Sequence, residues 1–142
     1  MITVNTSPLA QAVIGGKLLE HDHSLVTANK RQIDVYRRNR RLLLDGLAAR
    51  FPDSGPFPVS WNRPSGGFFV VVDVPFTADD SALEEAARQH GVLWTPMSHF
   101  YEGTGGKRQL RLFCSVLTLH QITDGLDRLH AFVTATVAGD AT

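Results

Sequence analysis

Three short apolar runs, each next to glycine or proline, limit this chain to a small sheet covered by helices. They occur within the segments 61–69, 91–101 and 109–115. Apolar runs of this length between turn residues are typical of strands. The third run places Arg111 between two leucines, and a guanidinium is expensive to bury in hydrocarbon unless an anion meets it. Arg111 is therefore the residue on which the functional prediction depends.

Composition and charge narrow the class of protein. The 142 residues, 43% of them apolar, fit one domain or a piece of a larger one. A formal net charge of zero argues against nucleic acid or an anionic membrane as partner. The single cysteine, Cys114, cannot form a disulfide within the chain, which is typical of a reducing compartment, and we expect a buried, inert thiol. Because neither a long apolar stretch nor a signal-peptide pattern is found, we expect a cytoplasmic protein.

The spacing of apolar and turn residues predicts the order of the elements. Ser7 and either Asp79 or Asp80 are expected to cap helices. The predicted helices cover residues 7–20, 25–50, 79–90 and 119–137. The predicted strands cover residues 59–62, 68–74, 92–95 and 110–114, the first two forming a hairpin. This order predicts an α+β fold, a small and mostly antiparallel sheet covered by helices and preceded by a long helix.

Several other patterns favour structural roles. The basic block 37–41 has no interleaved aromatic residues, so a solvated or ion-paired helix face is favoured over a nucleic-acid site. The pair His21 and His23 has no third ligand, and His99 has no partner at metal-ligand spacing. The glycine-rich stretch 103–107 precedes a strand rather than a helix, which favours a mobile loop over a phosphate site.

A set of motifs occurs in a fixed order along the chain. They are Asn5-Thr6-Ser7-Pro8-Leu9, Pro64-Ser65-Gly66-Gly67-Phe68, Gly91-Val92 leading to Pro96 and Phe100, Arg111-Leu112, and a closing helix through Leu129. This order resembles the C-terminal part of the fold-type-I, pyridoxal-phosphate-dependent aminotransferases of class I/II, over about residues 3–134. The segments 4–8 and 92–101 resemble transaminases of arylglycine and other non-proteinogenic amino acids.

The resemblance implies roles for particular residues. Arg111 is similar to the family arginine that pairs with the substrate α-carboxylate, a task that suits a planar guanidinium. The alternative is an ion pair with a structural acid such as Asp73. Phe100 and Tyr101 are implied to line the pocket for the substrate side chain. The residues implied to approach the cofactor phosphate are Asn5, Thr6 and Gln11.

The resemblance also implies a division of the chain. We expect a remnant of the large cofactor domain, an interdomain helix and the small C-terminal domain, at residues 1–24, 25–50 and 51–142. The family needs a lysine that carries the cofactor, and none of the lysines stands in the family's Ser-Lys context: Lys17, Lys30 and Lys107. The chain alone is therefore expected to be inactive and to hold no pyridoxal phosphate covalently.

The leading hypothesis is the substrate-carboxylate-binding portion of an aminotransferase. Its expected partners are an amino acid or 2-oxo acid, and the missing large domain or a second copy of the chain in a homo-oligomer. Two alternatives stay open. One is a non-catalytic assembly or binding module derived from an aminotransferase, and the other is part of a different pyridoxal-phosphate enzyme, an oxidase, cyclase or decarboxylase.

Overall fold

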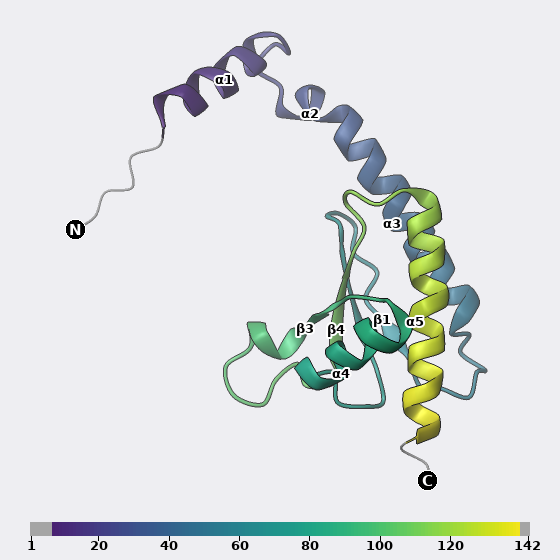
Figure 1. The fold of residues 1–142 in the computed structure, drawn as a ribbon. Coiled ribbons are helices and arrows are strands. Elements are labelled where there is room, and N and C mark those ends of the chain that lie inside the picture. The colour runs from purple at the N-terminus through teal and green to yellow at the C-terminus, as the bar shows by residue number, and fades with distance from the viewer. Residues whose placement is uncertain (1–6, 140–142) are drawn as a thin grey trace. The chain divides into compact units, whose positions relative to one another are not determined.

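The computed structural model describes residues 7–139, which fall into two compact units that divide the chain after Val35. The helices are α1 (Pro8–Leu19), α2 (Leu25–Ala28), α3 (Lys30–Arg50), α4 (Asp80–Glu85) and α5 (Leu119–Gly139) (Figure 1). The strands are β1 (Ser60–Trp61), β2 (Phe69–Asp73), β3 (Thr95–Pro96) and β4 (Gln109–Phe113). A π-helical turn, η1 (Ala86–His90), extends α4, and a 3-10 turn, η2 (Met97–Phe100), follows β3. No described helix is long and apolar enough to cross a membrane.

The first unit holds α1, α2 and the start of α3. Pro8 occupies the first turn of α1, as predicted, but the side chain of Ser7 makes no capping hydrogen bond. The prediction of one continuous helix over residues 25–50 is wrong. The helix breaks at Asn29, which ends α2, and Ser24 caps that short helix by accepting a backbone N–H at 3.2 Å. A serine cap and an asparagine favour a local turn over an uninterrupted helix.

The second unit contains a four-stranded sheet in the order β1-β2-β4-β3, and every neighbouring pair is antiparallel. This arrangement confirms the predicted α+β fold. The predicted strand over residues 92–95 is wrong in extent, because only Thr95 and Pro96 pair with β4. Proline is tolerated there because β3 is an edge strand. Val92 and Leu93, which precede β3, line a cavity instead.

Alternation along the central strands separates the two faces of the sheet. Val70, Val72 and Leu110 are buried, whereas Phe69 and Phe113 are exposed. The buried face packs with α3 and α5 into one core, which includes Leu43, Leu47, Ile122, Leu126, Leu129 and Phe132. The end of α3 lies beside α5 (Figure 1), and Arg50 Nη2 meets Asp127 Oδ1 at 2.6 Å. The face with Phe69 and Phe113 remains open.

Two adjacent side chains of α3 bind the backbone of the segments that connect the strands. Asn39 is fully buried, and its Nδ2 donates to the carbonyl oxygens of Cys114 at 2.8 Å and Leu117 at 2.9 Å. Arg40 donates to the carbonyl oxygens of Ser65 at 3.0 Å and Gly67 at 3.1 Å. Helix α3 therefore fixes both the end of β4 and the turn that leads into β2.

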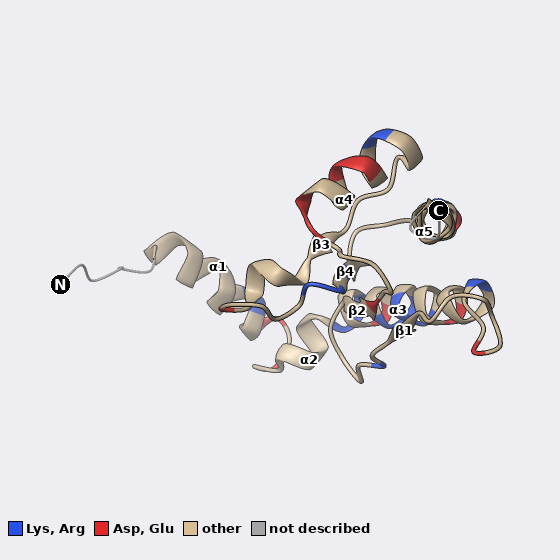
Figure 2. Cartoon of the chain, turned by 90° about the horizontal axis from the view of Figure 1, so that it is seen from below, with Lys and Arg blue, Asp and Glu red and all other residues tan. Residues whose placement is uncertain are grey.

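The basic block was predicted to form a solvated or ion-paired helix face, and this prediction is correct for only part of the block. Figure 2 shows basic residues spaced along α3. The side chain of Arg41 is 85% exposed and pairs with Asp45 at 3.7 Å, as expected for a surface ion pair. Arg40 differs because its guanidinium binds backbone carbonyls of the hairpin. One basic residue of the block is thus structural.

Replacing Asn39 with leucine should destabilise the second unit by about 2 kcal/mol, because two buried carbonyl groups lose their donor. The measurement is urea unfolding followed by tryptophan fluorescence, since Trp61 and Trp94 both lie in this unit. Arg41→Ala on the same helix is the matched control and should change stability by less than about 0.5 kcal/mol. Equal effects of the two substitutions would contradict this role for Asn39.

Cys114 is a fully buried free cysteine, as predicted. Burial raises the pKa of its thiol above the usual range, and the positive charge of Arg40 offsets part of that shift. The folded state therefore holds this proton more tightly than the unfolded state does. Its contribution to stability is fully present below the unfolded thiol pKa of about 8.5 and is lost as the pH rises above it.

The unfolding free energy should decrease more between about pH 7.5 and about pH 9.5 in the wild-type chain than in Cys114→Ala. The alanine variant is expected to be less stable at the lower pH, because it leaves a small cavity. Parallel declines in the two proteins would show that this thiol does not contribute to the alkaline loss of stability.

Candidate functional site

Arg111 lies at the centre of the open face of the sheet. Strand β4 runs between β2 and β3, so Arg111 pairs with Val71 on one side and with Thr95 on the other. The expectation that the flanking leucines enclose this arginine is wrong. Its leucine neighbours in the sequence point to the buried face, since successive side chains alternate, and Arg111 itself is partly exposed.

Two phenyl rings flank the guanidinium of Arg111. Its Cζ lies 4.3 Å from the centroid of the Phe69 ring and 4.2 Å from that of the Phe100 ring. Phe69 comes from β2 and Phe100 from η2, which follows β3, so the rings approach from opposite sides of β4. Both rings are substantially exposed, at 40% for Phe69 and 53% for Phe100. Each contact is a cation–π interaction.

The positive charge of Arg111 has no acidic partner among residues 7–139. The alternative ion pair with Asp73 is not formed, because Asp73 Oδ1 instead accepts a hydrogen bond from Gln109 Nε2 at 2.8 Å. In the same part of the chain, Arg111 Nε is buried without a hydrogen-bond partner. A guanidinium with free donors on an apolar surface is suited to bind a carboxylate or another anion.

Aromatic contacts connect this site to helix α3. The ring of Tyr36 lies 5.1 Å from that of Phe68, and Phe68 lies 4.5 Å from Phe69. Arg40 holds the turn that precedes these two phenylalanines. Phe69 is therefore placed by contacts that begin in the helix as well as by its strand.

The segment that carries Phe100 is fixed by two further contacts. His99 Nε2 lies 3.0 Å from Asp80 Oδ1 at the start of α4. The ring of Tyr101 lies so close to the glycine-rich stretch that a Cβ on Gly105 would come within 2.6 Å of it. The stretch 103–107 thus packs against this segment.

The structure brings together only some of the predicted site residues. Arg111 and Phe100 are in contact, whereas Tyr101, 49% exposed, packs on the glycine loop. Gln11 lies on α1 in the other unit. Asn5 and Thr6 lie outside the described residues. The substrate and cofactor roles of these residues stay predictions.

Phe69 is the contact residue that sequence analysis missed. The available signal was the alternation along Phe69–Asp73, which puts Phe69 and Val71 on one face of the sheet. That signal becomes useful only with the register, which sets Val71 opposite Arg111 and Phe69 one diagonal position away.

The described residues contain no candidate metal site. No group of three or more His, Cys, Asp or Glu side chains there is placed to hold a metal ion. His21 precedes α2 in the turn after α1, as the loop prediction implies, and His99 is engaged with Asp80.

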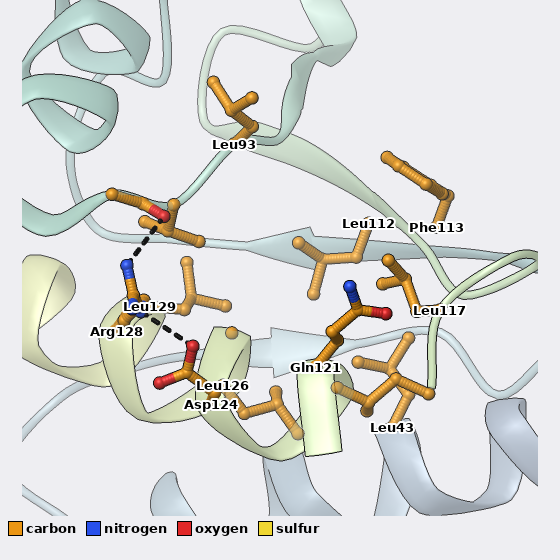
Figure 3. A pocket seen from close by; sticks show the side chains of 14 residues that line it. Leu43, Leu93, Leu112, Phe113, Leu117, Gln121, Asp124, Leu126, Arg128 and Leu129 are labelled. Carbon is orange, nitrogen blue, oxygen red and sulfur yellow. Dashed lines mark hydrogen bonds and ion pairs between the residues drawn. The ribbon is translucent and has the colours of Figure 1, made fainter. Parts of the chain in front are cut away.

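A cavity of about 390 Å³ lies between α5, β4 and residues 91–93. Figure 3 shows leucine side chains from several elements pointing into it, among them Leu43, Leu112 and Leu126. Its charged residues already have partners, since Arg128 Nε meets Asp124 Oδ2 at 3.0 Å. The lining is mostly apolar, and Arg111 is not among its residues.

Comparison with known proteins gives the family. No family model matches the chain. It is 56% identical over 136 residues to (S)-3,5-dihydroxyphenylglycine transaminase from Amycolatopsis orientalis, covering 95% of this chain and 30% of that enzyme. The chain corresponds to the C-terminal part of a fold-type-I aminotransferase. The aminotransferases of this family depend on pyridoxal phosphate.

Solved structures agree with this assignment. The α-aminoadipate aminotransferase from Thermus thermophilus, complexed with N-(5'-phosphopyridoxyl)-L-leucine, matches 96% of this chain and 33% of its own, with a TM-score of 0.79 at 26% identity. The aminotransferase Aro9 from C. albicans matches 99% of this chain and 33% of its own, with a TM-score of 0.81 at 17% identity, and shows the fold alone. The chain thus spans about 30% of the length of its first curated relative.

The contacts that the family makes to pyridoxal phosphate stay predictions for this chain. The cofactor requires a lysine amine and a cup of donors for its phosphate. Lys17 Nζ is paired with Glu20 at 3.2 Å on α1, and two of the three residues expected near the phosphate lie outside the described region. A guanidinium such as that of Arg111 suits a carboxylate.

Gly106→Ala should displace the segment that carries Phe100. Gly106 has φ +70°, and an added Cβ would lie 2.7 Å from the backbone carbon of Met97 and 2.8 Å from the backbone nitrogen of Ser98. Backbone atoms cannot yield as a flexible side chain does. Amide chemical shifts of residues 97–101 are expected to move, and stability should fall by more than about 1 kcal/mol.

Gly103→Ala is the matched control, because Gly103 has a similar φ of +79° but no atom within 4 Å of an added Cβ. It should show only the cost of the left-handed backbone, about 1 kcal/mol, with residues 97–101 unshifted. Indistinguishable spectra of the two variants would rule out the close contact as the cause.

Proposed function

We propose that this chain supplies the substrate-carboxylate site of a pyridoxal-phosphate-dependent aminotransferase, with Arg111 as the residue that binds the carboxylate. The observation that carries the proposal is the state of Arg111. Its guanidinium lies between two exposed rings, without an acidic partner among the described residues. A structural arginine in such apolar surroundings would be expected to have a permanent counter-charge.

The chemistry of transamination suits a fixed carboxylate site. An amino acid and its 2-oxo acid differ at the α-carbon but share the α-carboxylate, so one guanidinium can hold both. Two parallel N–H···O bonds fix the orientation of the carboxylate as well as its position. The rings of Phe69 and Phe100 exclude water beside the ion pair, which strengthens its electrostatic attraction.

The substrate class we propose is an arylglycine or a similar aromatic amino acid. The relative that is 56% identical over 95% of this chain is named for 3,5-dihydroxyphenylglycine. The open face also presents exposed aromatic side chains near the arginine, Phe69 and Phe100 among them. Aromatic surfaces favour contact with an aromatic ring.

The complete protein would contain the remaining parts of the enzyme. Pyridoxal phosphate, when bound there, supplies the carbonyl group and the electron-withdrawing ring that the reaction requires. We propose that the rest of the enzyme, in the same or an associated chain, provides that site, and that the complete enzyme assembles as a homo-oligomer. Arg111 would then hold the substrate while residues of that remaining part of the enzyme move the α-proton.

A chimera tests this proposal. The C-terminal part of the Amycolatopsis orientalis transaminase is replaced by this chain, which its 56% identity over 136 residues allows. The chimera should transaminate 3,5-dihydroxyphenylglycine. Arg111→Lys should lower kcat/KM by about 10- to 100-fold, because lysine cannot form the bidentate pair.

The control is Arg41→Lys, a matched change at an arginine that is 85% exposed. It should leave kcat/KM unchanged. A folded chimera without activity would contradict the proposed role of the chain. An active chimera in which Arg111→Lys has no effect would contradict the proposed role of Arg111.

A further inference from the structure

We propose that Phe69 and Phe100 act together as a positioning clamp that holds the Arg111 guanidinium in one plane and makes the site selective for planar anions. This inference rests on the proposed carboxylate-binding function and adds to it. It assigns the orientation of the arginine, and the discrimination between anions, to two residues that do not themselves bind the charge.

The placement of the rings supports a clamp. Cζ of Arg111 is nearly equidistant from the two ring centroids, at 4.3 Å for Phe69 and 4.2 Å for Phe100. The rings arrive from the two strands that border β4, one from β2 and one from the turn after β3. No contact between these rings is found in the described part of the chain. The rings therefore lie at different positions around the guanidinium, and the clamp places one on each of its faces.

In this site the two rings orient the arginine, a role that an acidic side chain has at many other arginines. A carboxylate partner would orient an arginine but would also neutralise it and occupy its donors. Phenyl rings attract the cation through their faces and leave the in-plane N–H groups free. Arg111 Nε is buried without a hydrogen-bond partner among residues 7–139. Neither Nη atom is buried in this way. The Nη end is thus the part open to a ligand.

The two covered faces determine the direction of approach. An anion can reach the donors only in the guanidinium plane, through the slot between the rings. A carboxylate is planar and fits this slot with both oxygens bonded. A sulfonate of the same charge is tetrahedral, so its third oxygen projects out of the plane toward a ring. The clamp therefore predicts that carboxylates bind more tightly than matched sulfonates.

Both rings are supported independently. Phe69 packs on Phe68, which packs on Tyr36 of α3. Phe100 follows His99, which meets Asp80 Oδ1 at 3.0 Å. Residues that only filled exposed surface would not need such support on each side of the arginine.

The test uses the whole 142-residue chain, labelled with ¹⁵N, and a matched pair of monoanions, phenylacetate and phenylmethanesulfonate. Binding is followed through the Arg111 Nε–H signal, which is assigned by its loss in Arg111→Lys. In the wild type, ring currents should shift this signal upfield, and phenylacetate should bind several-fold more tightly than the sulfonate. Phe69→Leu and Phe100→Leu should each remove part of the ring-current shift and weaken phenylacetate binding about 3-fold. In both variants the affinity for phenylacetate should be closer to the affinity for phenylmethanesulfonate than it is in the wild type.

Phe113→Leu is the matched control, because Phe113 lies opposite Phe69 in the ladder and is similarly exposed, at 43% against 40%. It should change neither the Arg111 signal nor the preference, and Phe100→Tyr should keep both. Backbone amide spectra identify any variant that fails to fold, and the other leucine variant then carries the test. If both leucine variants retain the shift, affinity and preference of the wild type, the clamp is overturned. If Arg111→Gln binds phenylacetate as the wild type does, the carboxylate-binding function itself fails, whatever the ring-current shift.

Discussion

The contact of one guanidinium with two phenyl rings is the interaction on which the functional reading of this chain depends. Arg111 lies on the middle of the open sheet face, 4.3 Å and 4.2 Å from the rings of Phe69 and Phe100. Cation–π attraction fixes the side chain without cancelling its charge. The site therefore keeps a cation that has no acidic partner among residues 7–139, and this is the basis of the proposed carboxylate binding.

Helix α3 explains why this arrangement can be held on so small a sheet. Asn39 binds the backbone just after β4, Arg40 binds the turn before β2, and Tyr36 supports the aromatic contacts that end at Phe69. All three side chains lie within five residues of one helix. The helix thus connects the packing of the core to the geometry of the open face. The mostly apolar cavity on the other side of the sheet has no part in this chemistry.

Sequence patterns predicted the elements well where local chemistry decides them. The antiparallel hairpin, the closing helix and a cap at Asp79, one of the two candidate aspartates, all follow from turn residues, apolar spacing and capping residues. The same patterns failed at Asn29, where the long helix is interrupted, and at residues 92–94, which leave the sheet. The break at Asn29 has a local cause that the apolar spacing did not reveal, the serine cap and the asparagine turn, whereas the extent of β3 depends on pairing with a distant strand. Arg111 and Phe100 were identified through family resemblance, and Phe69 was not.

The sequence by itself determined the class of fold and the presence of an arginine that needed a partner. Only the tertiary structure decided what that partner is. Whether Arg111 meets Asp73, a leucine core or two rings depends on strand register and on the order β1-β2-β4-β3. These are non-local properties, because they join residues about 10 to 40 positions apart, and each one-residue shift of register would move a side chain to the other face of the sheet.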